Sequence, residues 1–165
     1  MKKLFLTTAV AILCVLWSVA AMAQTGLNQT DLMKKWLGSG TWQAKYNADT
    51  TEVWECRSYG QEGIIVEVSY LIHGKKTPYY HNSISYDPGE SNFKGFVLES
   101  NGRYVTWIGA WSDEKTFSID LVSNFDPASA GERMKHTSVS PGIWTWSEMD
   151  MNGVVRRTFT FTRQE

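Results

Sequence analysis

The sequence predicts an all-β protein, with roughly ten antiparallel strands in an up-and-down barrel and one short helix before them. Three observations predict this class. Short runs that alternate apolar and polar residues recur from residue 41 to the end of the chain, and turn residues interrupt them about every ten positions. Aromatic residues make up 13% of the chain, and they favour strands over helices.

The first 23 residues have the pattern of a secretory signal peptide. Lys2 and Lys3 precede an apolar run at positions 4–20, and the small-x-small sequence that a signal peptidase cuts ends at Ala23. We therefore expect cleavage after Ala23 and export to the periplasm or the exterior. A retained membrane anchor is the alternative, because about 17 apolar residues approach the length that spans a bilayer.

The remaining chain, residues 24–165, is expected to form a single domain. It has 142 residues, with 14 basic against 17 acidic side chains and a net charge of -3. This charge gives no attraction to nucleic acid or to an anionic membrane surface, so neither is expected as a partner. Cys56 is the one cysteine left after cleavage, so no internal disulfide forms, and we expect a buried thiol that packs as a small apolar group. The sequence does not fix the oligomeric state.

A short helix is predicted just before the first strand. Thr30 is the expected N-cap, and Asp31 suits the positive end of the helix. Apolar residues at positions 32, 33, 36 and 37 share one helical face, and Gly38 and Gly40 end the helix.

The strands follow in close succession, and tight turns such as Asn101-Gly102 and Asn152-Gly153 make them consecutive hairpins. An open sheet of this size leaves two exposed edges, and closure into a barrel removes them, so we favour the barrel over an open sandwich. The expected strands are residues 41–47, 51–58, 63–73, 78–87, 92–99, 102–111, 115–123, 132–139, 142–150 and 153–163.

Gly40-Thr41-Trp42 opens the first strand after the helix and resembles the Gly-x-Trp signature of lipocalins and their calycin relatives. That resemblance implies that Trp42 closes one end of the barrel and that Arg163, at the end of the last strand, packs over it. With Ser85-Tyr86-Asp87-Pro88 and the terminal strand, the sequence is similar to exported bacterial lipocalin-like barrels of a domain-of-unknown-function family. It departs from true lipocalins in strand number and in lacking their disulfide, and the resemblance implies a calycin-like fold without an activity.

Aromatic side chains are the strongest candidates for a binding site. The mouth of a β-barrel is a common place for a pocket, and pockets are mostly apolar and aromatic. The leading hypothesis is an exported barrel that binds a small hydrophobic or amphipathic molecule, and the alternative is a structural or protein- or glycan-binding module with a filled barrel. The candidate lining residues are Trp54, Tyr80, Tyr86, Trp107, Trp144 and Trp146.

Histidines give no clear metal or cofactor site. A hairpin between His73 and His81 would bring two imidazoles together, but no third ligand is visible, and solvated residues at the rim are the simpler interpretation. His136 alternates with charged residues and lacks the motif expected of a haem-binding barrel. We therefore expect no cofactor and no metal.

Catalytic motifs are also missing from the sequence. It has no Gly-x-Ser-x-Gly elbow and no glycine-rich phosphate cradle, so an enzyme is the least favoured hypothesis and no catalytic residue is assigned. A carboxylate or histidine that points into a polar cavity would favour an enzyme. The strand carboxylates to consider are Glu52, Glu55, Glu67, Glu99, Asp120 and Glu148.

Overall fold

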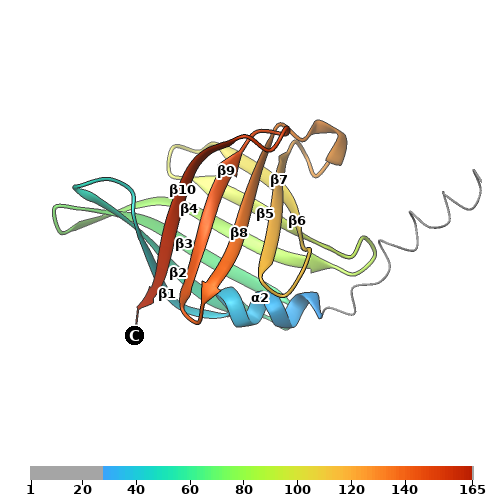
Figure 1. Ribbon diagram of the computed structural model, residues 1–165, viewed down its shortest axis with the longest axis horizontal. Coiled ribbons are helices and arrows are strands. Elements are labelled where there is room, and N and C mark those ends of the chain that lie inside the picture. The colour runs from blue at the N-terminus through green and yellow to red at the C-terminus, as the bar shows by residue number, and fades with distance from the viewer. Residues whose placement is uncertain (1–27, 165) are drawn as a thin grey trace, which may run out of the picture.

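The computed structural model describes residues 28–164, so the predicted leader at residues 1–23 and its cleavage site lie outside the described part. The described chain is a closed barrel of ten strands with one α-helix across one end (Figure 1). None of the helices among these residues has the length and apolar character needed to cross a membrane. The predicted fold class, a closed all-antiparallel barrel with one short helix on its N-terminal side, is confirmed.

The elements follow one another with short connections. In chain order they are α2 (Gln29–Leu37), β1 (Ser39–Lys45), β2 (Thr50–Tyr59), β3 (Gly63–Ile72), β4 (Lys75–Asp87), β5 (Asn92–Glu99), β6 (Tyr104–Trp111), β7 (Thr116–Val122), the 3-10 turn η1 (Pro127–Ser129), β8 (Glu132–Ser140), β9 (Ile143–Met149) and β10 (Val155–Gln164).

Closure depends on the pairing of the first and last strands. Every strand pairs antiparallel with its neighbour in sequence, and β10 returns to pair with β1 from Thr41–Gln164 to Ala44–Phe161. The sheet therefore has no free edge, and the open sandwich is excluded.

The N-cap of helix α2 lies two residues earlier in the chain than predicted. Asn28 is the N-cap, and its side-chain oxygen accepts hydrogen bonds from the Asp31 amide at 3.2 Å and from the Thr30 hydroxyl at 3.0 Å. The prediction of Thr30 as the cap was wrong because Asn28 competes for the same amide groups two residues earlier. The helix ends at Leu37 with Gly38 as its C-cap, where the sequence predicted the end.

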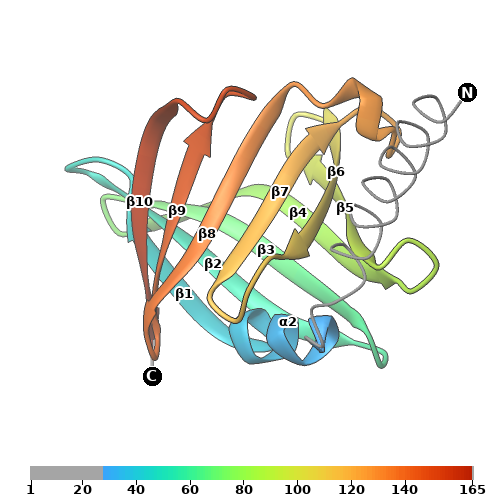
Figure 2. The same cartoon turned by 45° about the vertical axis from the view of Figure 1, so that its right-hand side comes forward.

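The apolar face of α2 plugs one end of the barrel (Figure 2). Met33 and Leu37 are almost fully buried, and such side chains each contribute about 1.5–3 kcal/mol to stability. Gln29 anchors the helix to β6, because its side chain donates to the Trp111 carbonyl at 3.2 Å and accepts from the Trp111 amide at 2.9 Å. The helix is therefore fixed to the barrel by packing and by a two-way amide contact.

Strand β4 is longer than predicted, since it begins at Lys75 and not at residue 78. The prediction placed Pro78 at the strand start because proline cannot donate to a ladder. The β3–β4 register shifts between Val68 and Ser69, opposite Tyr80 and Pro78. This bulge accommodates the missing N–H, so the strand continues through the proline.

Trp42 and Arg163 meet at the junction of β1 and β10. They are direct partners in the ladder, and the Arg163 guanidinium lies 5.8 Å from the centre of the Trp42 ring. The guanidinium also donates to the Ser39 carbonyl. Gly40 has a φ of +134°, and a Cβ there would lie 3.1 Å from the guanidinium, so glycine leaves the room that Arg163 occupies.

Candidate ligand-binding cavity

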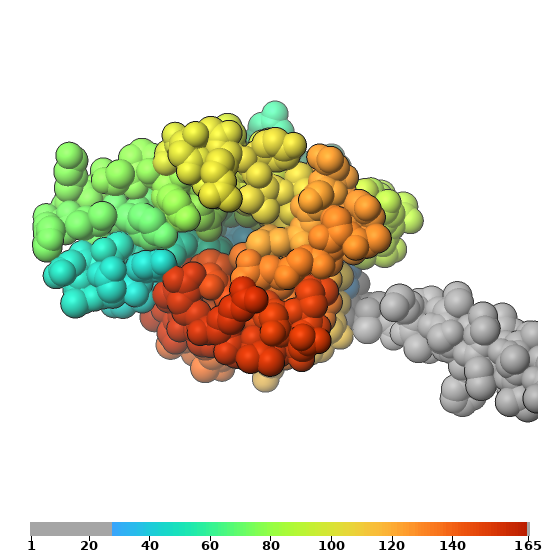
Figure 3. Space-filling view, turned by 90° about the horizontal axis from the view of Figure 1, so that it is seen from above, coloured from blue at the N-terminus to red at the C-terminus, as the bar shows by residue number. Residues whose placement is uncertain are grey.

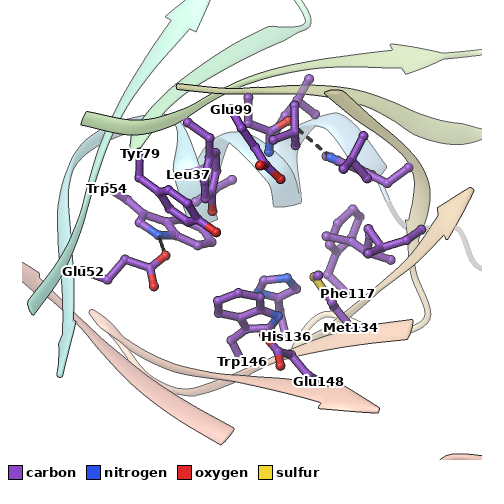
Figure 4. A pocket seen from close by; sticks show the side chains of 18 of the residues that line it. Leu37, Glu52, Trp54, Tyr79, Glu99, Phe117, Met134, His136, Trp146 and Glu148 are labelled. Carbon is purple, nitrogen blue, oxygen red and sulfur yellow. Dashed lines mark hydrogen bonds between the residues drawn. The ribbon is translucent and has the colours of Figure 1, made fainter. Parts of the chain in front are cut away.

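A cavity of about 230 Å³ occupies the barrel interior and is open to solvent. Figure 3 looks onto the end opposite α2 and shows that this end is hollowed at its centre. Aromatic and apolar residues from the helix and the strands form the floor, whereas carboxylates, tyrosines and one arginine lie toward the open end. Figure 4 looks into this space with α2 behind it.

Rings from α2 and β8 form the floor. Trp36 reaches from the helix to within 4.7 Å of the His136 ring and 5.5 Å of the Phe117 ring, measured between ring centres. On its other side His136 lies parallel to Trp146, with ring centres 6.1 Å apart and an interplanar angle of 1°. The helix therefore closes the barrel and also completes the wall of the cavity.

His136 is the polar group of this floor. Its residue is 3% exposed, and neither ring nitrogen has a hydrogen-bond partner among the described residues. Burial among aromatic rings lowers its pKa to about 3, so the imidazole is neutral at physiological pH. One nitrogen is then a donor and the other an acceptor, and both are unpartnered in the floor of a cavity.

Trp107 forms part of the wall because glycine faces it. A Cβ on Gly95 would lie 1.9 Å from the indole, so the ring rests directly on the backbone of β5. The Trp107 ring nitrogen donates to the Asn82 side-chain oxygen at 3.2 Å, which fixes the ring plane.

Glu52 is a buried acid beside the cavity. The residue is 2% exposed, and its carboxylate accepts a hydrogen bond of 2.6 Å from the Trp54 indole (Figure 4). Burial raises the pKa of Glu52, and the hydrogen bond from Trp54 offsets part of that rise.

Arg157 and Glu148 form an ion pair at the open end. The guanidinium donates to both carboxylate oxygens at 2.8–3.0 Å and to the Tyr46 hydroxyl at 2.8 Å. It also lies over the rings of Tyr46 and Phe159, at 5.3 and 5.0 Å from their centres. The pair raises the pKa of Arg157 and leaves little net charge at this side of the mouth.

Three tyrosines of β3 and β4 continue the wall between Glu52 and Glu99. The Tyr70 and Tyr79 rings stack at 4.6 Å, and Tyr79 contacts Tyr80 edge-on at 5.1 Å. Burial first, and then nearby carboxylate charge, raises the pKa of all three hydroxyls. They are therefore neutral hydrogen-bonding groups.

Four of the six predicted lining residues border the cavity: Trp54, Tyr80, Trp107 and Trp146. Trp144 and Tyr86 do not border it, and whether any of the six residues contacts a ligand stays a prediction. Trp144 shares the inward face of β9 but stacks on Phe161 at 4.4 Å below the floor. Tyr86 packs on Phe93 at 5.0 Å near the closed end of β4. Both lie too close to α2 to reach the open space.

Three of the strand carboxylates considered from the sequence, Glu52, Glu99 and Glu148, border the cavity, although none was among the predicted lining residues. Glu52 lies two positions before Trp54, and Glu148 lies two positions after Trp146, so strand alternation places each carboxylate on the face of its tryptophan. Trp36 had no such signal, because only the docking of α2 brings it into the wall. The other residues that were not predicted to line the cavity include Leu37, Tyr46, Tyr70, Tyr79, Phe117, Met134, His136 and Arg157.

The hairpin at residues 73–74 does not bring His73 and His81 together. His73 is exposed at the turn, whereas His81 lies on the outer wall, where its Nδ1 contacts Glu67 and its Nε2 contacts Ser83, both at 2.8 Å. This order matches a Ser-His-acid relay, but the strand amides beside Ser83 belong to β4 ladders and Ser83 does not line the barrel cavity. Among residues 28–164 there is no group of three metal-ligating side chains.

The thiol of Cys56 is buried, as the sequence predicted, and burial raises its pKa to about 12. It packs in the core beside the strand pair β1–β2 and takes no part in the cavity.

Comparison with known proteins returns no relative: the sequence matches no protein-family model and no curated protein. The structure itself defines the class. It is a closed, ten-stranded antiparallel barrel with a helix plug and an internal aromatic cavity, and this architecture is compatible with a calycin-like fold.

Proposed function

We propose that this protein binds a small amphipathic molecule inside the barrel. The observation that carries the proposal is the cavity itself, which is lined by aromatic rings at its floor and by polar groups at its open end. Side chains alone fill an eight-stranded barrel, and two further strands give the interior its room. A dry engineered cavity of about 150 Å³ accepts benzene. A space of about 230 Å³ therefore suits one substituted ring or a short chain.

The sequence supports two further parts of this proposal. The leader at residues 1–23 favours a protein that acts in the periplasm or outside the cell. Gly40, Trp42 and Arg163, in the arrangement described above, favour kinship with lipocalin-like barrels. A role as ligand carrier or sensor agrees with both, because such barrels present a closed scaffold with one open mouth.

Binding is tested by titrating the protein with short fatty acids, aromatic alcohols and aromatic amines while tryptophan emission is recorded. Trp36, Trp54, Trp107 and Trp146 line the cavity, so a bound ligand changes their emission saturably. Val97→Trp fills part of the space and is expected to abolish the binding measured by calorimetry. Leu98→Trp is the matched control, since its side chain lies on the outer wall. Equal binding by both variants, or no saturable change with any ligand, contradicts the proposal.

An enzyme is the second candidate, and one observation favours it: Glu52 and His136 both border the cavity and both have shifted pKa values. A buried carboxylate beside an indole can remove a proton from a bound substrate. The test uses 5-nitrobenzisoxazole, whose ring opens when a base takes its C–H proton and the N–O bond breaks. Turnover that Glu52→Gln removes supports a proton-transfer enzyme, and turnover no faster than in buffer contradicts it.

A module with a filled barrel is disfavoured by the cavity. The outer wall does carry an exposed apolar group, in which Phe96 stacks on Tyr104 at 5.6 Å beside Leu98. Nothing in the structure shows what would cover it.

A further inference from the structure

Charge around the cavity is unequal. Three carboxylates border it, those of Glu52, Glu99 and Glu148, against one basic side chain, Arg157. Figure 4 shows the three carboxylates projecting from different sides of the wall. Arg157 gives its hydrogen bonds to Glu148 and Tyr46 and forms no ion pair with the other two acids, although its charge lowers the pKa of Glu52.

Glu52 has no cation of its own. Within residues 28–164, no basic side chain lies within 4.0 Å of its carboxylate, and its one hydrogen bond comes from the Trp54 indole. Glu52 is only 2% exposed, and burying a carboxylate without a positive partner lowers the stability of the folded protein. The second carboxylate oxygen therefore remains available to a cation that enters the cavity.

Glu99 is only weakly compensated. Its carboxylate accepts from Asn101 at 2.9 Å, and its nearest basic group is Arg103 at 4.0 Å. The Arg103 side chain is 74% exposed, and such surface pairs contribute little. Glu99 is thus a second site of negative charge at the mouth, on the other side of Tyr79 from Glu52 (Figure 4).

Aromatic faces lie between these two acids. Tyr79 stacks on Tyr70, and the Tyr46 ring is 5.4 Å from the Tyr70 ring. Tyrosine faces attract cations, and the same cluster already holds one cation, because the Arg157 guanidinium lies over Tyr46. The mouth therefore combines carboxylates and ring faces, the two kinds of group that recognise an organic ammonium.

A separate feature indicates that a ligand reaches the floor. His136 is 3% exposed and lines the cavity, yet neither of its ring nitrogens has a hydrogen-bond partner in the part of the chain that the structure describes. Buried polar groups in folded proteins are normally hydrogen-bonded. Since this imidazole is neutral, it adds no positive charge to oppose the carboxylates.

We propose that the ligand is an organic cation: an amine whose ammonium lies between Glu52 and Glu99 against Tyr79, and whose apolar body points toward the tryptophans of the floor. This inference rests on the proposed binding function and names its ligand class. The ammonium group of such a ligand supplies the positive charge that Glu52 and Glu99 lack. A ligand of the same size that carries a carboxylate is instead repelled by these two acids. A neutral molecule of the same shape gains the apolar contacts only.

The experiment measures calorimetric binding of three probes that share one ring: phenethylamine, phenethyl alcohol and phenylacetate. We expect the amine to bind most tightly and phenylacetate least. Glu52→Gln keeps the shape of the side chain and an acceptor for Trp54. It should weaken binding of the amine about tenfold, because a charge-assisted hydrogen bond becomes a neutral one. Binding of the alcohol should change less than about twofold in the same variant.

Two further variants complete the test. Glu99→Gln removes the second negative charge, and it should also weaken binding of the amine more than binding of the alcohol. This variant keeps the proposal testable if Glu52→Gln folds poorly. Glu55→Gln is the control: Glu55 lies on the outer face of β2 and pairs with Lys76 at 2.6 Å, so its loss should leave all three affinities unchanged.

The outcomes separate the two proposals. If the alcohol binds as tightly as the amine, or if Glu52→Gln weakens both probes equally, the barrel is a binding protein but its ligand is not a cation. If none of the three probes binds at millimolar concentration, both the cation and the proposed function are contradicted. If the amine binds Glu52→Gln and Glu99→Gln as tightly as the parent, these two residues do not bind its ammonium group and the proposal is overturned.

Discussion

His136 should make the stability of this barrel sensitive to acid. Burial lowers its folded-state pKa to about 3, while in the unfolded chain the imidazole has its ordinary value of about 6.5. Between these two values the unfolded chain binds a proton that the folded protein does not bind. Stability contributed by the neutral imidazole is therefore complete above pH 6.5 and is lost as the pH falls toward 3.

The size of the effect follows from the two pKa values. At pH 5 the solution is 1.5 pKa units below the unfolded value and still above the folded one, so the loss is about 2 kcal/mol at 1.36 kcal/mol per unit. Other groups titrate in the same range. Asp87 and Asp113 have lowered pKa values and add to the acid loss, whereas the raised pKa of Glu52 opposes it. A comparison of variants isolates the histidine from all three.

The variant is His136→Phe, which keeps a ring against Trp146 and removes the titration. Urea unfolding followed by circular dichroism gives the free energy of unfolding at pH 7 and at pH 5. Between these pH values the parent should lose about 2 kcal/mol more than His136→Phe. The control is His73→Asn, at an exposed turn position with a φ of +48° that asparagine accepts, and it should follow the parent.

One result would refute this reasoning. If His136→Phe and the parent lose the same free energy between pH 7 and pH 5, the imidazole of the folded protein takes up its proton as easily as that of the unfolded chain. The side chain would then be solvated or hydrogen-bonded, and the description of the cavity floor would be wrong.

Three other predictions test the wall, the core and the closure. Gly95→Ala should cost about 1–3 kcal/mol in urea unfolding and shift tryptophan emission, because Trp107 must move, whereas Gly131→Ala, with open space around it, should do neither. Cys56 should not react with a thiol reagent until denaturant is added, and rapid labelling of the native protein would contradict its burial. Arg163→Met removes a cation–π contact and a backbone hydrogen bond, so the melting temperature should fall by about 2–4 °C, a change that circular dichroism resolves.

The fold was accessible from the sequence because its signals are local. Alternation and turn residues placed all ten strands, and the edge argument led from ten hairpin-linked strands to a closed barrel. The predicted ends of two elements were wrong, at β4 and α2, because contacts with neighbouring residues outweighed the preference of a single residue. Pro78 lies inside β4 because a bulge in β3–β4 pairing tolerates it, and Asn28 replaces Thr30 as the cap of α2.

The cavity was less accessible because alternation gives the face of a residue but not its depth. Trp144 and Trp146 share the inward face of β9, yet one lies under the floor and the other in the wall. His136 lies between Lys135 and Thr137, and nothing in that stretch distinguishes an inward imidazole from a solvated one. Its burial depends on the curvature of the closed barrel and on Trp36, which arrives from a helix far away in sequence.

The polar groups of the interior argue that the cavity is more than a packing defect. Within residues 28–164, Glu52 has no paired cation and His136 has no hydrogen-bond partner, and both residues are almost fully removed from solvent. Each lowers stability relative to an apolar residue of the same shape. These two groups border one cavity and adjoin the same indole, that of Trp54. Residues that weaken a fold and share a single cavity are expected where a ligand completes their contacts.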